Sequence, residues 1–176
     1  MISVGSDWKT KNFSCLIDVV AQINAKYGKD AISLTIVGVD DETFATRCKN
    51  FSFVKNIGPL QREALVDEMN QQDVFVLASK DEALGVSLLE ASALGLFVIG
   101  SNVGGIPEII DNNSSGFLFD PFNPDSLFAA IERYMNLTFN ERSVFIDKSM
   151  RKVKAFSQTT MLQKVCELYE KQFSLL

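Results

Sequence analysis

The chain has 176 residues, of which 47% are hydrophobic and 22% charged, which is typical of one globular domain with a substantial core. Its formal net charge of −5 argues against a general nucleic-acid surface, and we expect no nucleic-acid partner. Histidine is absent, so these residues exclude chemistry that needs an imidazole base or ligand. No apolar run approaches the roughly 20 residues that a membrane-spanning helix needs.

Strand and helix patterns alternate along the chain. Short apolar runs predict strands at residues 2–6, 32–38, 51–58, 73–79, 96–101 and 116–119. Helical spacing and turn residues predict helices at 12–28, at 60–71, around Glu90, just after Pro107, and over most of 124–176. This order predicts an α/β domain with a doubly wound, Rossmann-like parallel sheet and a helical C-terminal segment.

The cysteines and the first residues of the chain indicate the cellular compartment in which the protein is expected. Cys15, Cys48 and Cys166 are odd in number and lack paired spacing, which favours reduced thiols over a disulfide frame or a zinc site. The opening "MISVGSDWK" has no basic segment followed by an apolar one, so it is not a signal peptide. We therefore expect a cytoplasmic protein.

Doubly wound sheets bind ligands at the carboxyl ends of their strands, so the turns that follow the strands are the places to search. The turn "SKDEALG" precedes a helix that we expect to begin near Leu84. The first amides of a helix lack internal partners and suit an anion such as phosphate. Gly85 removes a side chain where a ligand could approach, and the alternative is a glycine kept for packing.

Glu90 is the one charged residue between Val86 and Gly100. It lies six residues beyond Leu84, roughly 9 Å along a helix, and helical side chains lean toward the amino terminus, so its carboxylate is expected to point toward the crevice. A carboxylate there could accept hydrogen bonds from two neighbouring hydroxyls, as on a ribose. The alternative is a half-buried glutamate with its hydrogen bonds satisfied by the protein.

Glu82, seven intervening residues and Glu90, together with "LGVSLLEA", resemble the acidic motif of retaining GT-B glycosyltransferases, often called glycosyltransferase group one. The resemblance extends from residue 2 to about 175 and is strongest over 73–120, where "GGIPE" also follows the family pattern. It corresponds to the carboxyl-terminal, donor-binding half of a GT-B fold. Residues 1–176 would then form a single nucleotide-sugar binding domain, with the amino-terminal acceptor domain absent from this chain.

The resemblance also implies roles for individual residues. Glu90 would bind the ribose hydroxyls of the donor, and Glu82 would contact the transferred sugar. The backbone amides of Leu84, Gly85 and Val86 would bind the diphosphate.

The family places two cations in the turn after its first strand to neutralise the diphosphate. Lys11 matches the lysine, but Ser6 occupies the position of the arginine. Loss of one cation beside a leaving diphosphate could weaken catalysis by orders of magnitude. Lys9 and Lys80 are the candidates to compensate for the missing arginine, and the alternative for each is a solvated surface lysine.

A second turn at the crevice contains Gly104 and Gly105, which would let the backbone approach a ligand, unless they serve only a tight turn before Pro107. The base pocket implied by the resemblance is backbone near residues 55–58. The family generally handles phosphate without a divalent metal, and no acid-x-acid motif lies in a turn, so we expect neither a metal nor another cofactor.

The implied function is transfer of a sugar from a nucleotide diphosphate sugar to a polysaccharide or glycolipid acceptor, by a domain that is inactive alone. A nucleotide-sugar-binding module without transferase activity is the alternative, and Ser6 in the position of the arginine makes it less remote. A dinucleotide-dependent dehydrogenase would need a G-x-G-x-x-G turn after the first strand, and none is there.

The last predicted helix has an apolar face that could contact a partner. Met161, Val165, Leu168 and Tyr169 share that face, so we expect exposed apolar surface and self-association when the acceptor domain is missing. Lipid-linked acceptors of relatives imply that the full-length enzyme works at the inner face of a membrane, although no basic amphipathic helix supports this here.

Overall fold

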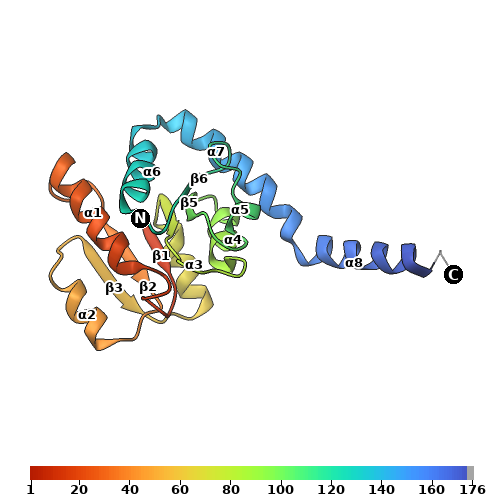
Figure 1. Ribbon diagram of the computed structural model, residues 1–176, viewed down its shortest axis with the longest axis horizontal. Helices are drawn as coiled ribbons and strands as arrows, with labels where there is room; N and C mark the ends of the chain where they lie inside the picture. The colour runs from red at the N-terminus through yellow and green to blue at the C-terminus, as the bar shows by residue number, and fades with distance from the viewer. Residues whose placement is uncertain (174–176) are drawn as a thin grey trace.

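The computed structural model describes residues 1–173, apart from the side chains of 158, 161, 164 and 170–173 (Figure 1). Its strands form a six-stranded sheet in the order β3-β2-β1-β4-β5-β6, and every pair is parallel. The strands are β1 (Ile2–Val4), β2 (Leu34–Val37), β3 (Val54–Gly58), β4 (Val74–Leu77), β5 (Phe97–Ser101) and β6 (Phe117–Phe119). This order confirms the predicted doubly wound sheet.

Helices follow the strands and then complete the chain. They are α1 (Phe13–Tyr27), α2 (Glu42–Cys48), α3 (Arg62–Asn70), α4 (Val86–Ala93), α5 (Ile106–Ile109), α6 (Pro124–Asn136), α7 (Phe139–Val153), a 3-10 turn at Lys154–Phe156 and α8 (Gln158–Phe173). Among the described residues, no helix combines the length and the apolar character needed to cross a bilayer.

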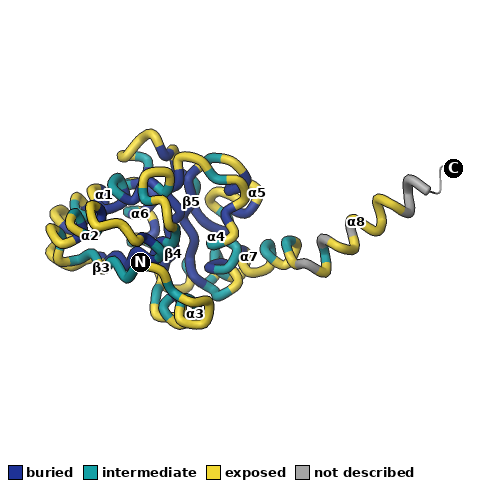
Figure 2. The backbone as a smooth tube through the Cα atoms, turned by 90° about the horizontal axis from the view of Figure 1, so that it is seen from below, coloured by how far each residue is buried: buried dark blue, intermediate teal, exposed yellow. Residues whose placement is uncertain are grey.

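The sheet lies between two layers of helices, and its central strands are buried while the edge strand β3 is partly exposed (Figure 2). Alternate residues of β4 illustrate why. Val74 and Val76 pack into the core shared with α1, α2 and α6, whereas Phe75 and Leu77 pack into the core shared with α3, α4 and α5. Because both faces are covered, the strand is apolar throughout, as expected of a parallel sheet.

Helix α7 joins the two layers. Phe145 packs against the α1 and α6 side, and Val153 at the other end packs against the α3 and α4 side. Between them, the Ser149 hydroxyl donates to the Ser92 hydroxyl of α4 at 3.0 Å in a buried position. This contact satisfies two polar groups in the core and fixes α7 against α4.

The observed helices differ from the predicted ones in two places. The helix containing Glu90 begins at Val86, two residues later than expected, because Gly85 has a left-handed conformation that cannot continue a helix. Helix α2 was not predicted at all. Its signal is Asp41, whose carboxylate accepts a hydrogen bond from the Phe44 amide at 2.7 Å and caps the helix.

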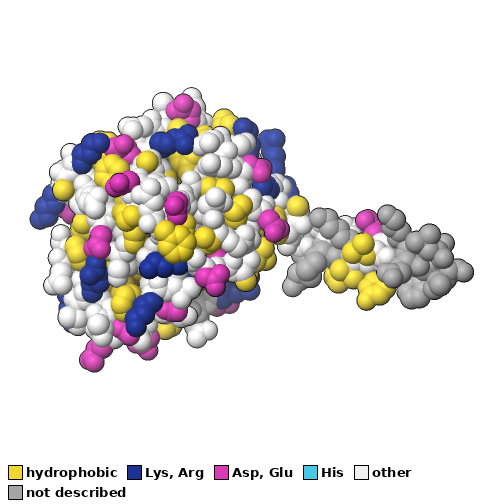
Figure 3. Space-filling view, in the orientation of Figure 1, with side chains coloured by type: hydrophobic (Ala, Val, Ile, Leu, Met, Phe, Trp, Pro, Cys, Tyr) yellow, Lys and Arg dark blue, Asp and Glu magenta, His cyan; other side chains and the backbone are white. Residues whose placement is uncertain are grey.

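Helix α8 extends away from the body of the protein, and the large apolar side chains described on it remain exposed (Figures 1 and 3). Leu162, Val165 and Leu168 are exposed, as is Tyr169. The side chain of Met161 lies outside the described residues. Exposed apolar surface is therefore present where it was expected, and self-association stays a prediction.

We expect Leu168→Glu to reduce self-association, because a charge on the α8 face would have to be desolvated at the contact. Sedimentation velocity across a concentration series measures the effect. Val144→Glu, a change at a similarly exposed apolar residue of α7, is the matched control and should leave association unchanged. A monomeric parent chain at high concentration would contradict the expectation.

Candidate functional site

The site residues predicted from the sequence lie near the point where the strand order of the sheet reverses, between β1 and β4. Strands β1 and β4 are neighbours, and the chain continues from β1 toward β2 on one side and from β4 toward β5 on the other. The turns after them meet, since the Lys80 amide donates to the Thr10 carbonyl at 2.8 Å. Ligands of doubly wound sheets bind in the crevice at this switch point.

An ion pair spans the crevice between these two turns. The Lys11 ammonium donates to Oε2 of Glu82 at 2.5 Å, and the two side chains are only 21% and 14% exposed. The Ser79 hydroxyl donates to the same oxygen at 3.3 Å. No described residue donates to Oε1, so this oxygen remains able to accept a hydroxyl hydrogen bond. The structure thus brings together Lys11, expected to neutralise the diphosphate, and Glu82, expected to contact the transferred sugar.

Gly104 and Gly105 support the turn that carries Glu82. A Cβ at Gly104 would lie 1.5 Å from the Glu82 carbonyl oxygen, and one at Gly105 would lie 2.6 Å from that of Ala83. The Gly105 amide donates to the Ala83 carbonyl at 3.0 Å. The close approach that these glycines permit is therefore between two turns of the protein. Their proposed contact with a ligand stays a prediction.

Helix α4 begins beside this ion pair. Gly85 has φ +85, and a Cβ there would meet Leu77 at 3.3 Å, so its lack of a side chain serves packing. The backbone amides from Leu84 to Ser87 donate to no other group in the part of the chain that the structure describes, and no side chain caps the helix. Free amides and the positive end of the helix dipole suit an anion.

Glu90 lies on the side of α4 that faces α3. Its side chain is 37% exposed, and its Oε1 is 3.8 Å from a guanidinium nitrogen of Arg62, the first residue of α3. Sequence reasoning missed Arg62, because nothing in its own neighbourhood indicates that α3 packs against α4 at this point. Glu90 is thus half-buried with a cation nearby, and its role toward a ribose stays a prediction.

The turn after β1 is ordered by Asp7. Its carboxylate accepts hydrogen bonds from the Thr10 hydroxyl and from the amides of Lys9 and Thr10, which hold the pKa of Asp7 below its ordinary value. The Lys9 ammonium lies over the Trp8 ring, 5.4 Å from its centroid. Ser6 is exposed at the start of this turn. Lys9 is exposed and has this one local contact, and its role as a substitute for the arginine stays a prediction.

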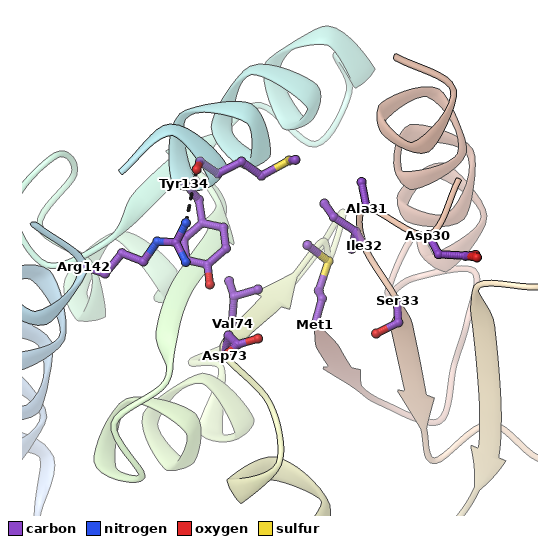
Figure 4. Close-up of a pocket in the computed structure, with 10 residues that line it drawn as sticks. Met1, Asp30, Ala31, Ile32, Ser33, Asp73, Val74, Tyr134 and Arg142 are labelled. Atoms are coloured by element: carbon purple, nitrogen blue, oxygen red, sulfur yellow. Dashed lines mark hydrogen bonds between the residues drawn. The ribbon is translucent and has the colours of Figure 1, made fainter. Parts of the chain in front are cut away.

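A cavity of about 330 Å³ lies at the opposite, amino-terminal edge of the sheet (Figure 4). Asp73 and Val74 at the start of β4 line it together with Arg142 and Tyr134. Arg142 lies over the Tyr134 ring at 4.5 Å and donates to a backbone carbonyl at 3.1 Å. Only one guanidinium nitrogen is hydrogen-bonded by these contacts, and Nε of Arg142 is buried without a hydrogen-bond partner among the described residues. None of the predicted site residues lines this cavity.

Among the described residues, metal ligands and reactive thiols are not gathered at the crevice. In the described part of the chain, no group of three or more acidic, cysteine or histidine side chains could hold a metal ion. Burial and the Asp18 carboxylate raise the pKa of the Cys15 thiol, which disfavours a thiolate. The cysteines are unpaired, in agreement with the sequence interpretation. Independence from a metal stays a prediction.

Comparison with known proteins places this geometry in a family. Residues 1–152 match the family described as glycosyl transferases group 1. The chain belongs to this family. Sulfoquinovosyl transferase SQD2 of Arabidopsis thaliana is 43% identical over 67 residues, which cover 36% of this chain and 13% of that protein.

Solved structures share the fold. The Anabaena protein HepE, solved in complex with UDP, superimposes with a TM-score of 0.81 and 19% identity over 97% of this chain and 48% of its own. The C-terminal domain of a group 1 glycosyl transferase from Francisella tularensis gives a TM-score of 0.74 and 21% identity, over 88% of this chain and 84% of that domain. This glycosyl transferase chain therefore spans about half of HepE and most of the isolated domain.

We expect Gly104→Ala to displace the turn that carries Glu82, because the new methyl group would overlap the Glu82 carbonyl. Gly95→Ala is the matched control, since Gly95 also has a positive φ, +81, but a Cβ there would meet nothing closer than 3.7 Å. Both changes incur about 1–2 kcal/mol of left-handed strain. The clash should cost Gly104→Ala about 1–3 kcal/mol more in urea unfolding. Equal losses in the two variants would refute the contact.

We expect Lys11→Met to lower the free energy of unfolding by about 1–3 kcal/mol, because it leaves the poorly exposed Glu82 carboxylate without its cation. Adding Glu82→Gln should recover part of the loss, since the unpaired charge is then gone. Lys26→Met, which breaks a more exposed pair with Glu132, serves as control and should cost less. Additive losses at Lys11 and Glu82 in urea unfolding would argue against the pair.

Proposed function

We propose that the chain is the donor-binding domain of a retaining glycosyltransferase, which moves a sugar from a nucleotide diphosphate sugar to a polysaccharide or glycolipid acceptor. The observation that carries the proposal is the ion pair between Lys11 and Glu82 beside the free amides of α4, at the switch point of the sheet. Family membership and the UDP bound by HepE support a nucleotide-sugar donor. An acceptor-binding domain would complete the enzyme, which we expect to act in the cytoplasm.

The donor would bind with its diphosphate at the amides of Leu84, Gly85 and Val86. The Lys11 ammonium would neutralise charge that grows on the leaving diphosphate as the bond from the sugar to the phosphate oxygen breaks. That bond's electrons leave with the nucleotide diphosphate. The acceptor hydroxyl then joins the sugar carbon on the same face, and its proton passes to the leaving phosphate. No strong base of this domain is needed, which suits a chain without histidine.

Glu82 and Glu90 would hold the two ends of the donor. Oε1 of Glu82 has no donor among the described residues and is able to accept a hydroxyl of the transferred sugar. Glu90 lies further along α4 and would accept the ribose hydroxyls. The exposed Ser6 favours the second candidate, a nucleotide-sugar-binding module without transfer activity, because the turn offers one fewer cation than the family pattern.

Calorimetric titration with UDP, GDP, ADP and their common sugar conjugates tests the donor site. We expect one nucleotide to bind and Glu90→Gln to weaken it about tenfold or more, since a carboxylate accepts stronger hydrogen bonds than an amide. Glu63→Gln, an exposed glutamate of α3, is the control and should leave the affinity unchanged. Equal affinity in Glu90→Gln would remove Glu90 from the site.

Ser6→Arg separates the two candidate functions. If the chain belongs to a transferase, the added guanidinium should raise the affinity of Ser6→Arg for the nucleotide. Transfer activity should then appear once an acceptor domain is supplied. Release of nucleotide diphosphate in the presence of acceptor measures this. A parent chain that binds nucleotide but never releases diphosphate, with or without arginine at position 6, would support the binding module.

A further inference from the structure

Arg62 and Glu90 form an ion pair that differs in kind from the pair of Lys11 and Glu82. The guanidinium nitrogen is 3.8 Å from Oε1 of Glu90, which is beyond hydrogen-bond distance, whereas the Lys11 ammonium is 2.5 Å from Glu82. Attraction between unit charges persists at this separation. Arg62 therefore compensates the charge of Glu90 while leaving the carboxylate oxygens free to accept hydrogen bonds.

The surroundings of Glu90 offer no substitute for this cation. A cavity of about 180 Å³ between α3 and α4 is lined by Arg62, Glu90 and five apolar side chains: Leu65, Val66, Met69, Ala93 and Leu94. Among the described residues, no group donates a hydrogen bond to the Glu90 carboxylate, and no second cation lies within 4.0 Å of it. A half-buried charge against an apolar wall needs a compensating partner.

Arg62 is well placed to act through Glu90 without supporting the fold. Its side chain is 82% exposed, so replacing it removes no core packing. It is the first residue of α3, which follows the turn after β3 at the carboxyl edge of the sheet. Both members of the pair therefore belong to elements that begin at the crevice.

We propose that Arg62 is a positioning residue for the donor nucleotide: its guanidinium orients the Glu90 carboxylate and balances its charge, so that both oxygens face the paired hydroxyls of a ribose. This inference rests on the proposed function of Glu90. Arg62 acts on the nucleoside part of the donor and leaves the diphosphate to Lys11 and the amides of α4. It is thereby distinct from the arginine that Ser6 replaces.

A double-mutant cycle in nucleotide binding tests the inference. Arg62→Gln should weaken UDP binding about two- to fivefold, the range expected of a partly exposed ion pair, and Arg62→Lys should retain most of the affinity. In the Glu90→Gln background, Arg62→Gln should have no further effect. Raising the salt concentration should shrink the effect of Arg62→Gln. Arg47→Gln, which breaks an exposed ion pair with Asp18, is the matched control.

Inorganic diphosphate is the second probe, because it contains no ribose. Arg62→Gln should leave its binding unchanged, whereas Lys11→Met should weaken it. Equal weakening of UDP and inorganic diphosphate by Arg62→Gln would make Arg62 a phosphate ligand and overturn the proposal. Tighter UDP binding by Arg62→Gln would also overturn it, because Arg62 would then compete with the ribose for Glu90.

The same titrations separate this proposal from the function on which it rests. If none of UDP, GDP and ADP binds the parent chain, the donor site fails and the role of Arg62 fails with it. If GDP or ADP binds in place of UDP, that nucleotide becomes the probe. If a nucleotide binds and depends on Glu90 but not on Arg62, the donor site stands and the positioning role alone is refuted.

Discussion

The position of the Glu82 backbone sets the geometry of the whole crevice. Its carbonyl lies where any side chain at position 104 would have to be, so the turn after β4 rests directly on the turn after β5. On the other side, Lys11 reaches from the turn after β1 to the Glu82 carboxylate. The turns after β1, β4 and β5 thus hold the short segment around Glu82 in place. The free amides at the start of α4 come directly after this segment.

Charge at the crevice is arranged in two pairs with different consequences. Lys11 donates a hydrogen bond to one carboxylate oxygen of Glu82. Arg62 lies 3.8 Å from Glu90, beyond hydrogen-bond distance, and donates to neither of its carboxylate oxygens. A ligand with hydroxyls on either side of a diphosphate would meet the Glu82 carboxylate at one end and the Glu90 carboxylate at the other. Its diphosphate would meet the free amides of α4 and the Lys11 ammonium. A nucleotide diphosphate sugar has this order of groups, which is why the proposed function fits the arrangement.

Much of the fold could be predicted from the sequence because the determining signals are local. Continuous apolar runs such as β4 indicate strands covered on both faces, and their alternation with helical spacing gives the doubly wound order. Helix α2 was missed because its seven residues carry too short a pattern. The start of α4 was misplaced because no local pattern in the sequence shows that Gly85 is left-handed.

The candidate site was predictable as a set of residues but not as a set of contacts. The motif around Glu82 and Glu90 could be recognised in the sequence, and the structure brings Glu82 and Lys11 together. The support that Gly104 gives to Glu82 and the approach of Arg62 to Glu90 join residues more than twenty positions apart. Such contacts depend on how whole elements pack, so spacing along the chain does not reveal them.

A crystal structure of the chain soaked with the nucleoside diphosphate that it binds would test the central claim most directly. The account predicts phosphate oxygens within hydrogen-bond distance of the amides between Leu84 and Ser87, and ribose hydroxyls on Glu90. A nucleotide bound elsewhere, such as the cavity lined by Tyr134 and Arg142 at the opposite edge of the sheet, would contradict it.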